Sequence, residues 1–300
     1  MLELVRGYAA AVLDEAGGRE GLDEVVDGLS QLRRLLVSSE PLRGALTDSS
    51  IPAEARSALL TDLLGGRVAE AVAALSSFAV RYDRAGELPK SLELLLELAE
   101  TRRLEQEAGM GVVAEPPMGR AGSLERLRGF AERIFEKVFE QAAVDGIEDD
   151  LFRLARLAEA QPELRSALSA PHAPLPARLA VLGELLGGKV RDETVALVGY
   201  VLRCGRARDL VGALDYLVEL AAAERGRRVA HVRAAVELDG DERTRLAEAL
   251  RARMRRPVEL RLVVDPTVLG GLGVAVGDTL IDGTVRHRLD QLRDSILQLD

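Results

Sequence analysis

Residues 2–12, LELVRGYAAAV, and residues 124–134, LERLRGFAERI, decide the fold, because they are two copies of one pattern. Their offset (124 − 2 = 122) carries forward without a gap through the following residues. At this offset the LLGG of 63–66 meets the LLGG of 185–188, and Arg81 meets Arg203. The period is far longer than the 20–50 residues of a solenoid repeat. We conclude that the sequence contains a tandem duplication of a whole domain.

The composition excludes several classes of protein. With 47% hydrophobic and 30% charged residues, the 300-residue chain is typical of globular proteins, with two or three domains. Aromatic residues make up only 3% and Trp is absent, so the cores must consist mainly of Leu, Val and Ala. This composition favours helices. The net charge of −9 argues against nucleic acid or an anionic membrane as the main partner.

The sequence also predicts a cytosolic chain. Its single cysteine, Cys204, cannot close an internal disulfide. No apolar run approaches the roughly 20 residues that span a bilayer. The N-terminus lacks the basic segment and apolar stretch of a signal peptide.

Each copy is predicted to be a bundle of five or six helices. Apolar residues recur at intervals of three and four over 22–36, and long helical patterns cover 68–82 and 88–107. The LLGG pairs favour helix ends, because Gly tolerates the left-handed conformation there. Gly and Pro punctuate the intervening segment too densely for a helix. The predicted domains are 1–108 and 123–228, joined by a linker at 109–122, and a tail at 229–300.

The tail changes character to a small mixed α/β domain. Alternating apolar residues predict strands, and Asp239 begins an acidic helix start that Pro257 brings to an end. The fold is therefore mainly α with a small α/β tail. The elements expected in the tail are a strand at 229–238, a helix from Asp239, a strand at 258–265, a hairpin of 272–276 and 279–281 turning at Gly277-Asp278, and a last helix over 285–299.

Residues 265–289, DPTVLGGLGVAVGDTLIDGTVRHRL, resemble the C-terminal signature of the δ subunit of bacterial rotary ATP synthases. That family includes the mitochondrial oligomycin-sensitivity-conferring protein. Residues 6–12, RGYAAAV, likewise resemble its N-terminal Arg-x-Tyr-Ala-x-Ala helix. The usual member has one helical domain before the tail. Two helical copies resemble the δ subunits of high-GC Gram-positive bacteria.

The resemblance implies a non-catalytic adaptor of the peripheral stalk. Such a subunit ties the N-terminal helices of the α subunits, at the crown of the catalytic head, to the b-type stalk subunit. The head is thereby kept from rotating with the rotor. The expected location is the cytoplasmic side of the cell membrane, reached only indirectly through the complex. The alternative is a soluble helical adaptor unrelated to the synthase.

The resemblance also implies partner-binding residues, because the family binds a partner helix in a groove between its first and fifth helices. The alternative is that these apolar residues are core, which periodicity cannot separate from a groove. For the stalk, an apolar face of the last helix is the candidate. The residues are Tyr8, Val12, Val72, Leu75 and Phe78 in copy one; Phe130, Ile134, Thr194, Leu197 and Tyr200 in copy two; and Leu289, Leu292 and Ile296 in the tail.

The C-terminal motif itself is predicted to be architectural. Gly270, Gly271 and Gly277 offer backbone conformations that other residues reach only with strain, and Gly277-Asp278 is the hairpin turn. Asp282, before Gly283, is a candidate cap for the last helix.

No chemistry is predicted. The spacing Gly271-x-Gly273-x-x-x-Gly277 lacks the helix and the parallel βαβ unit of a dinucleotide site. The arginines of 251–256 suit a helix C-terminus better than nucleic acid, and Cys204 is expected in the core. We therefore expect no catalytic residues, no cofactor and no metal, since the histidines have no paired spacing. The histidines are His172, His231 and His287.

Overall fold

The computed structural model describes most of the chain, in two compact units. Residues 1–134 and 150–218 form one unit, and residues 135–149 and 219–300 form the other. This division follows packing and not the sequence repeat, so the predicted domain boundaries stay a prediction. The described residues are 2–64, 68–82, 85–138, 141–170, 173–227, 229–254, 258–265, 268, 270–276 and 279–282.

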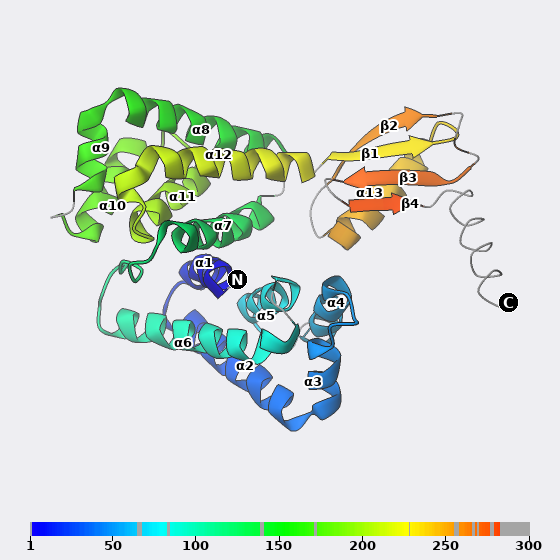
Figure 1. Cartoon of the computed structure of the whole chain (residues 1–300), viewed down its shortest axis with the longest axis horizontal. Coiled ribbons are helices and arrows are strands. Elements are labelled where there is room, and N and C mark those ends of the chain that lie inside the picture. Colours follow the sequence, from blue (N-terminus) through cyan, green and yellow to red (C-terminus); the bar gives the residue numbers. More distant parts are fainter. Residues whose placement is uncertain are drawn as a thin grey trace. The chain divides into compact units, whose positions relative to one another are not determined.

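Each copy of the repeat contributes six α-helices among the described residues, as the sequence predicts (Figure 1). A short 3-10 turn precedes the last helix of each copy, η1 at Ala85–Glu87 and η2 at Ala207–Asp209. The helices of copy one are α1 (Leu2–Glu15), α2 (Arg19–Ser38), α3 (Glu40–Thr47), α4 (Ala53–Leu64), α5 (Glu70–Tyr82) and α6 (Leu88–Glu107). Those of copy two are α7 (Arg120–Lys137), α8 (Gln141–Ala160), α9 (Pro162–Ser169), α10 (Leu175–Leu186), α11 (Asp192–Arg203) and α12 (Leu210–Arg227).

Local sequence explains where these helices begin and end. Ser39 accepts a hydrogen bond from the Leu42 N–H at the start of α3, and Pro41 lies in its first turn. In copy two, α10 ends at Leu186 and Gly188 takes a φ of +69°, so the second LLGG ends a helix as predicted. The glycines of the first LLGG lie outside the described residues.

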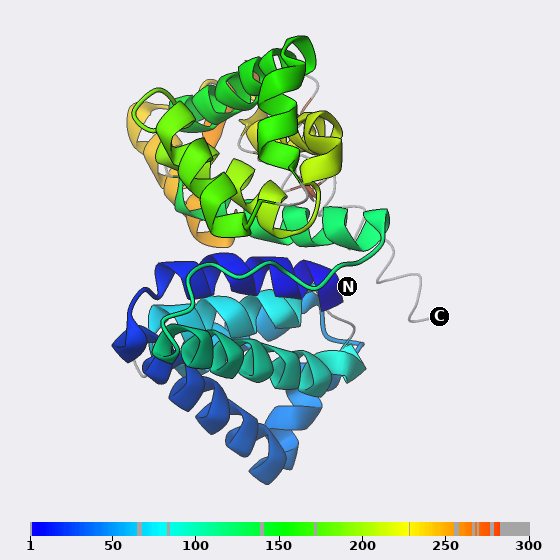
Figure 2. The same cartoon turned by 90° about the vertical axis from the view of Figure 1, so that its left-hand side faces the viewer.

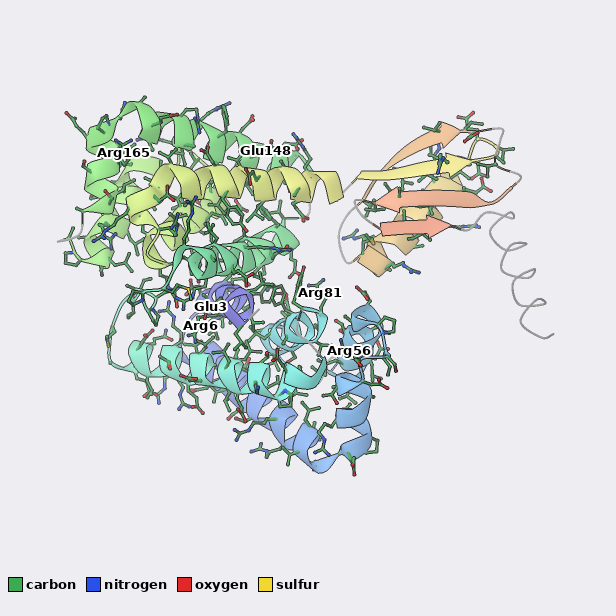
Figure 3. The ribbon with its side chains drawn as sticks, viewed as in Figure 1. Glu3, Arg6, Arg56, Arg81, Glu148 and Arg165 are labelled. Atoms are coloured by element: carbon green, nitrogen blue, oxygen red, sulfur yellow. The ribbon has the colours of Figure 1, made fainter. Side chains whose placement is uncertain are left out.

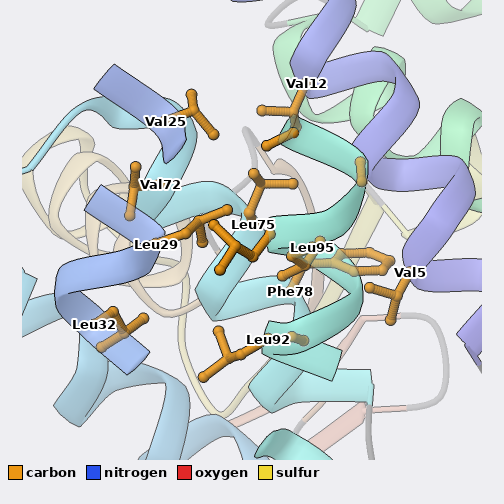
Figure 4. Packing of buried hydrophobic residues seen from close by; sticks show 14 of the residues in the cluster. Val5, Val12, Val25, Leu29, Leu32, Val72, Leu75, Phe78, Leu92 and Leu95 are labelled. Atoms are coloured by element: carbon orange, nitrogen blue, oxygen red, sulfur yellow. The ribbon is translucent and has the colours of Figure 1, made fainter. Parts of the chain in front are cut away.

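The core of copy one is built from leucine and valine with a few aromatic rings (Figure 4). Val5, Val12, Leu75 and Phe78 are among the side chains packed there, contributed by α1 and α5. Their burial supplies the main stabilising term of the bundle, about 1.5–3 kcal/mol for each fully buried large side chain.

One arginine contact repeats in both copies, with Arg56 buried and Arg178 half-buried. Arg56, labelled in Figure 3, donates a hydrogen bond of 2.9 Å to the Leu46 carbonyl oxygen. At the offset of 122, Arg178 donates to the Leu168 carbonyl at 3.4 Å. Each arginine thus satisfies a carbonyl in the last turn of the short third helix, where helical partners are missing.

The predicted linker is an extended segment that ends earlier than expected. Helix α7 already begins at Arg120, so Arg120, Ala121 and Gly122 are helical and not linker. Arg and Ala are strong helix formers, and they outweigh one glycine in the first turn. The extended part is held in place, because the Glu115 N–H donates to the Arg203 carbonyl oxygen at 3.0 Å.

The tail forms a mixed sheet with one crossover helix, which confirms the small α/β domain (Figure 1). The strand order is β2-β1-β3-β4; β1 and β2 are parallel, and β3 pairs antiparallel with both β1 and β4. Buried Ala230, Val232, Val274 and Val276 meet Leu250 of the helix. The elements are β1 (Val229–Ala234), α13 (Gly240–Met254), β2 (Glu259–Val264), β3 (Leu272–Val276) and β4 (Thr279–Asp282).

Strand β1 is shorter than the predicted 229–238. It ends at Ala234, whose carbonyl accepts the last cross-strand hydrogen bond, from the Asp265 N–H at 2.9 Å. Val236 lies beyond the strand and is exposed, so the alternation of apolar and polar residues after Ala234 does not mark a strand. The chain then turns into α13, where Asp239 and Glu242 each accept the other's backbone N–H. The predicted last helix over 285–299 lies outside the described residues.

Candidate functional site

The first and fifth helices of copy one bring the predicted residues together. The rings of Tyr8 on α1 and Phe78 on α5 stack with centroids 3.7 Å apart and an interplanar angle of 13°. The Arg81 guanidinium lies 5.8 Å from the Phe78 ring centroid, within cation–π range. Val12, Val72 and Leu75 are packed in the same core.

Copy two repeats this arrangement at the offset of 122. Phe130 on α7 and Tyr200 on α11 stack with centroids 4.1 Å apart and an interplanar angle of 8°. Arg203 lies over the Tyr200 ring at 5.7 Å, as Arg81 lies over Phe78. Thr194 and Leu197 are buried beside them, whereas Ile134 is half-buried.

These predicted side chains are core residues in both copies. Tyr8 and Phe78 are 2% and 1% exposed, and Phe130 and Tyr200 are 4% and 2% exposed. The two aromatic pairs therefore hold the first and fifth helices of each copy together. The role of these helices in binding a partner stays a prediction.

Helix α1 is buried on more than one side, because a second helix covers the face turned away from the copy-one core. Figure 2 shows α1 lying between the other helices of copy one and helix α7. The two backbones approach closely where each sequence copy has its glycine. A β-carbon built on Gly7 would lie 1.9 Å from the Arg126 carbonyl oxygen, and one on Gly129 would lie 2.0 Å from the Leu4 carbonyl oxygen. Only glycine fits at either position.

Charged side chains flank this crossing on both sides. Arg126 donates to Glu3 and, at 3.0 Å, to the Pro116 carbonyl oxygen. Arg133 donates to one carboxylate oxygen of Glu15 at 3.0 and 2.8 Å. Both arginines are buried, so each pair replaces lost hydration with directed, charge-assisted hydrogen bonds.

A third ionic cluster joins α1, α6, α11 and the linker. Asp14 accepts a hydrogen bond of 2.8 Å from Arg102 through one oxygen and another of 2.8 Å from Arg203 through the other. Arg203 also lies 3.4 Å from the Glu115 carboxylate. These contacts tie copy one to the part of copy two that lies in the same compact unit.

The C-terminal motif is only partly described. Gly270 and Gly271 have φ values of +129° and +81°, conformations that other residues rarely adopt, as the sequence predicts. Asp282 ends β4, but its side chain lies outside the described residues, so its capping role stays a prediction. Gly277, Asp278, Gly283, Leu289, Leu292 and Ile296 also lie outside the described residues.

The cysteine and the described histidine that were candidates for a reactive or metal-binding role lie within helices, strands or the core. The Cys204 thiol is buried, and that burial raises its pKa to about 11, so it is a poor nucleophile near neutral pH. Within the described ranges, no three His, Cys, Asp or Glu side chains are grouped as a metal site would require. His231 lies on β1, while His172 and His287 lie outside the described residues. In the described part of the chain, no helix has the length and apolarity needed to cross a membrane.

Two features of this region were missed by sequence reasoning. The glycine crossing had a signal, since Gly7 and Gly129 occupy the same position of the two copies. The ion pairs had none, because the partners are far apart in sequence: Glu15 pairs with Arg133, and Asp14 with Arg203.

A match to a known family identifies the group of proteins to which this chain belongs. The model of the family described as ATP synthase delta (OSCP) subunit matches residues 4–115 and again residues 128–296. The two matches cover both copies of the repeat and the tail. The chain belongs to this family. Its membership confirms the predicted resemblance and, with it, a structural subunit in place of an enzyme.

Relatives match over nearly the whole length. The ATP synthase subunit delta of Nocardioides sp. (strain ATCC BAA-499 / JS614) is 36% identical, over 97% of this chain and 97% of its own. That of Nocardia farcinica is 33% identical, over 95% and 98%. A chain of the Toxoplasma gondii mitochondrial ATP synthase hexamer is 17% identical over 57% of this chain, with a TM-score of 0.26 that carries no weight for the fold.

Proposed function

We propose that this chain is the δ subunit of a bacterial rotary ATP synthase and that it acts as a stator adaptor. In this role it binds the N-terminal helices of the α subunits at the crown of the catalytic head. Its tail binds the end of the b-type stalk subunit at the cytoplasmic side of the membrane. The protein thereby prevents the head from turning with the rotor. The observation that carries the proposal is the family match over both helical copies and the tail.

The packing of α1 supports a mechanical role. An adaptor that resists torque must transmit force between its binding surfaces without yielding. The glycine crossing and the buried pairs of Arg126 and Arg133 join the two copies through backbone contact and charge. Such close-packed interiors have low compressibility and transmit strain.

The site of head binding is the first and fifth helices of one or both copies. Since the rings of the aromatic pairs are buried, the partner helix binds along the outer edges of these helices. An amphipathic helix suits this task, because its apolar stripe covers a groove between two bundle helices.

The test is hydrogen exchange on the full-length chain with and without a synthetic peptide of its host's α-subunit N-terminus. Slowed exchange in α1 and α5 assigns binding to copy one, and slowed exchange in α7 and α11 assigns it to copy two. A peptide of the same composition in scrambled order is the control. Unchanged exchange in all four helices would contradict the proposed head contact.

The stalk contact is tested separately by co-purification of tagged full-length chain with synthase subunits. Replacing Leu292 by Asp places a charge on the predicted apolar face of the last helix. We expect this variant to lose the b-type subunit while it still binds the α-subunit peptide. Retention of the b-type subunit would move the stalk contact elsewhere.

A further inference from the structure

Copy one has an apolar groove with a basic rim, at the corner where the end of α2, the helix α3 and the start of α6 meet. We call it the α2–α6 groove; its volume is about 740 Å³. Leu36, Leu88 and Leu92 are buried side chains that line it. Val37 also lines the groove and is 73% exposed, so it extends the apolar surface out to the solvent.

Three arginines give this groove its charge. Arg33, Arg34 and Arg43 line it and are exposed, against a single acidic lining residue, Glu93. Arg43 has an exposed partner in Glu40 at 3.8 Å. No ion pair between described residues engages Arg33 or Arg34. In a chain with a net charge of −9, this concentration of uncompensated positive charge is local and distinct.

The equivalent corner of copy two is neutralised within the chain. Arg156 is the counterpart of Arg34, and it donates to Glu159 at 2.6 Å and also to Asp215. Glu159 is the counterpart of Val37, and Asp215 is the counterpart of Glu93, so copy one keeps one of the two acids and lacks the other. Copy one thus carries an exposed apolar side chain where copy two carries an internal counter-charge.

This difference points to an external partner for copy one. We infer that the α2–α6 groove binds an acidic amphipathic helix of another protein. Leucine-type side chains of that helix cover Leu36, Leu88, Leu92 and Val37, and its Glu or Asp side chains take the place that Glu159 fills in copy two. Charge complementarity of this kind fixes register and speeds association. The groove is separate from the first and fifth helices, so this inference does not rest on the proposed head contact.

The test uses the full-length chain and a fluorescein-labelled model peptide. The peptide is an amphipathic helix of about five turns, near 18 residues, with Leu along one stripe and Glu on the polar face. Its binding is followed by fluorescence anisotropy at low salt. The same peptide with Lys in place of Glu measures the contribution of charge. We expect saturable binding of the Glu peptide and at least about tenfold weaker binding of the Lys peptide.

Val37→Glu is the decisive variant, because it introduces into copy one the acid that copy two already has. We expect it to weaken binding of the Glu peptide about tenfold or more, and the double variant Arg33→Glu/Arg34→Glu to do the same. All three side chains are exposed, so unchanged thermal unfolding shows that the fold is intact. Glu159→Val is the matched control in copy two and leaves the affinity unchanged or higher.

Three outcomes would overturn the inference. The first is no saturable binding of the Glu peptide, or equal binding of the Lys peptide. The second is an unchanged affinity in Val37→Glu. The third is a wild-type chain that sediments as a dimer and a Val37→Glu variant that sediments as a monomer, because the groove would then be covered by a second copy of the chain.

Discussion

Copy one and copy two fill the same position between their second and fifth helices with opposite chemistry. In copy one Gly28 packs directly against Val72; a β-carbon on Gly28 would lie 2.6 Å from a Val72 methyl group. In copy two the same positions hold Asp150 and Thr194. The Asp150 carboxylate accepts the Arg191 N–H at 3.2 Å and the Thr194 hydroxyl at 3.4 Å.

The comparison shows that the contact between the second and fifth helices can be either a close apolar contact or a hydrogen-bonded polar cluster on the same backbone. Copy two gains a cap for α11, since Asp150 binds an N–H at the start of that helix from a neighbouring helix. Other equivalent positions kept their chemistry, among them the aromatic pairs and the arginines Arg56 and Arg178. The copies therefore differ at single contacts while their framework is shared.

The largest effect is expected where the copies touch. Replacing Gly7 by Ala puts a β-carbon 1.9 Å from the Arg126 carbonyl oxygen, so α1 and α7 must separate. We expect a loss of more than about 3 kcal/mol in the free energy of unfolding, at the upper end of overpacking effects. Urea unfolding followed by circular dichroism measures it.

The control for this prediction is Gly44→Ala on α3, where a β-carbon would meet nothing within 4 Å. This change should stabilise the chain by about 0.5–1 kcal/mol, because alanine loses less backbone freedom on folding. Equal stability of the two variants would mean that α1 and α7 do not pack as closely as described.

A double-mutant cycle sharpens the comparison of the second and fifth helices. Asp150→Ala should cost about 2–3 kcal/mol, because it leaves the buried Thr194 hydroxyl and the Arg191 N–H without their acceptor. Adding Thr194→Val gives copy two the apolar residue of copy one and should restore about 1 kcal/mol. Chemical denaturation of the four proteins gives the coupling energy, and strict additivity would refute the shared cluster.

Alkaline pH should destabilise the chain through copy two. Burial raises the Cys204 pKa from 9.0 to about 11, so the native state keeps a proton that the unfolded chain loses. This contribution is fully present below pH 9 and is lost as the pH rises to about 11, by up to about 3 kcal/mol. The measurement is the free energy of unfolding at a series of pH values.

Cys204→Ala should flatten that pH dependence between pH 9 and 11. The slope that remains at higher pH belongs in part to Tyr200, because burial raises its pKa as well. An identical pH profile for the variant and the wild type would show that the thiol is not buried in solution.

The smallest expected effect is a gain in stability. The Tyr200 hydroxyl is buried and has no hydrogen-bond partner among the described residues. Tyr200→Phe removes this unsatisfied group while the ring still stacks on Phe130, so we expect about 1 kcal/mol of stabilisation. Thermal unfolding measures it, and a lower melting temperature would show that the hydroxyl has a partner, such as a bound water.

The repeat made most of the fold predictable. One offset of 122 transferred every helical pattern from copy one to copy two, and alternation located the strands of the tail. Periodicity identifies the apolar face of a helix but not what covers it, so Tyr8 and Phe78 could not be assigned to groove or core. The contact of Gly7 with Arg126 depends on how α7 is placed in space, which local patterns do not encode.

The glycine crossing has a consequence for protein synthesis. Helix α1 leaves the ribosome before α7, because the Arg126 backbone that covers Gly7 is translated 119 residues later (126 − 7 = 119). At about 5–20 residues per second, that face of α1 stays uncovered for on the order of 10 s. During this interval α7 of a neighbouring nascent chain can pack against it, because it carries the same complementary backbone. The expected form of misassembly is therefore domain swapping, in which copy two of one chain packs on copy one of another. Slower translation favours it, because α1 then waits longer for its own α7.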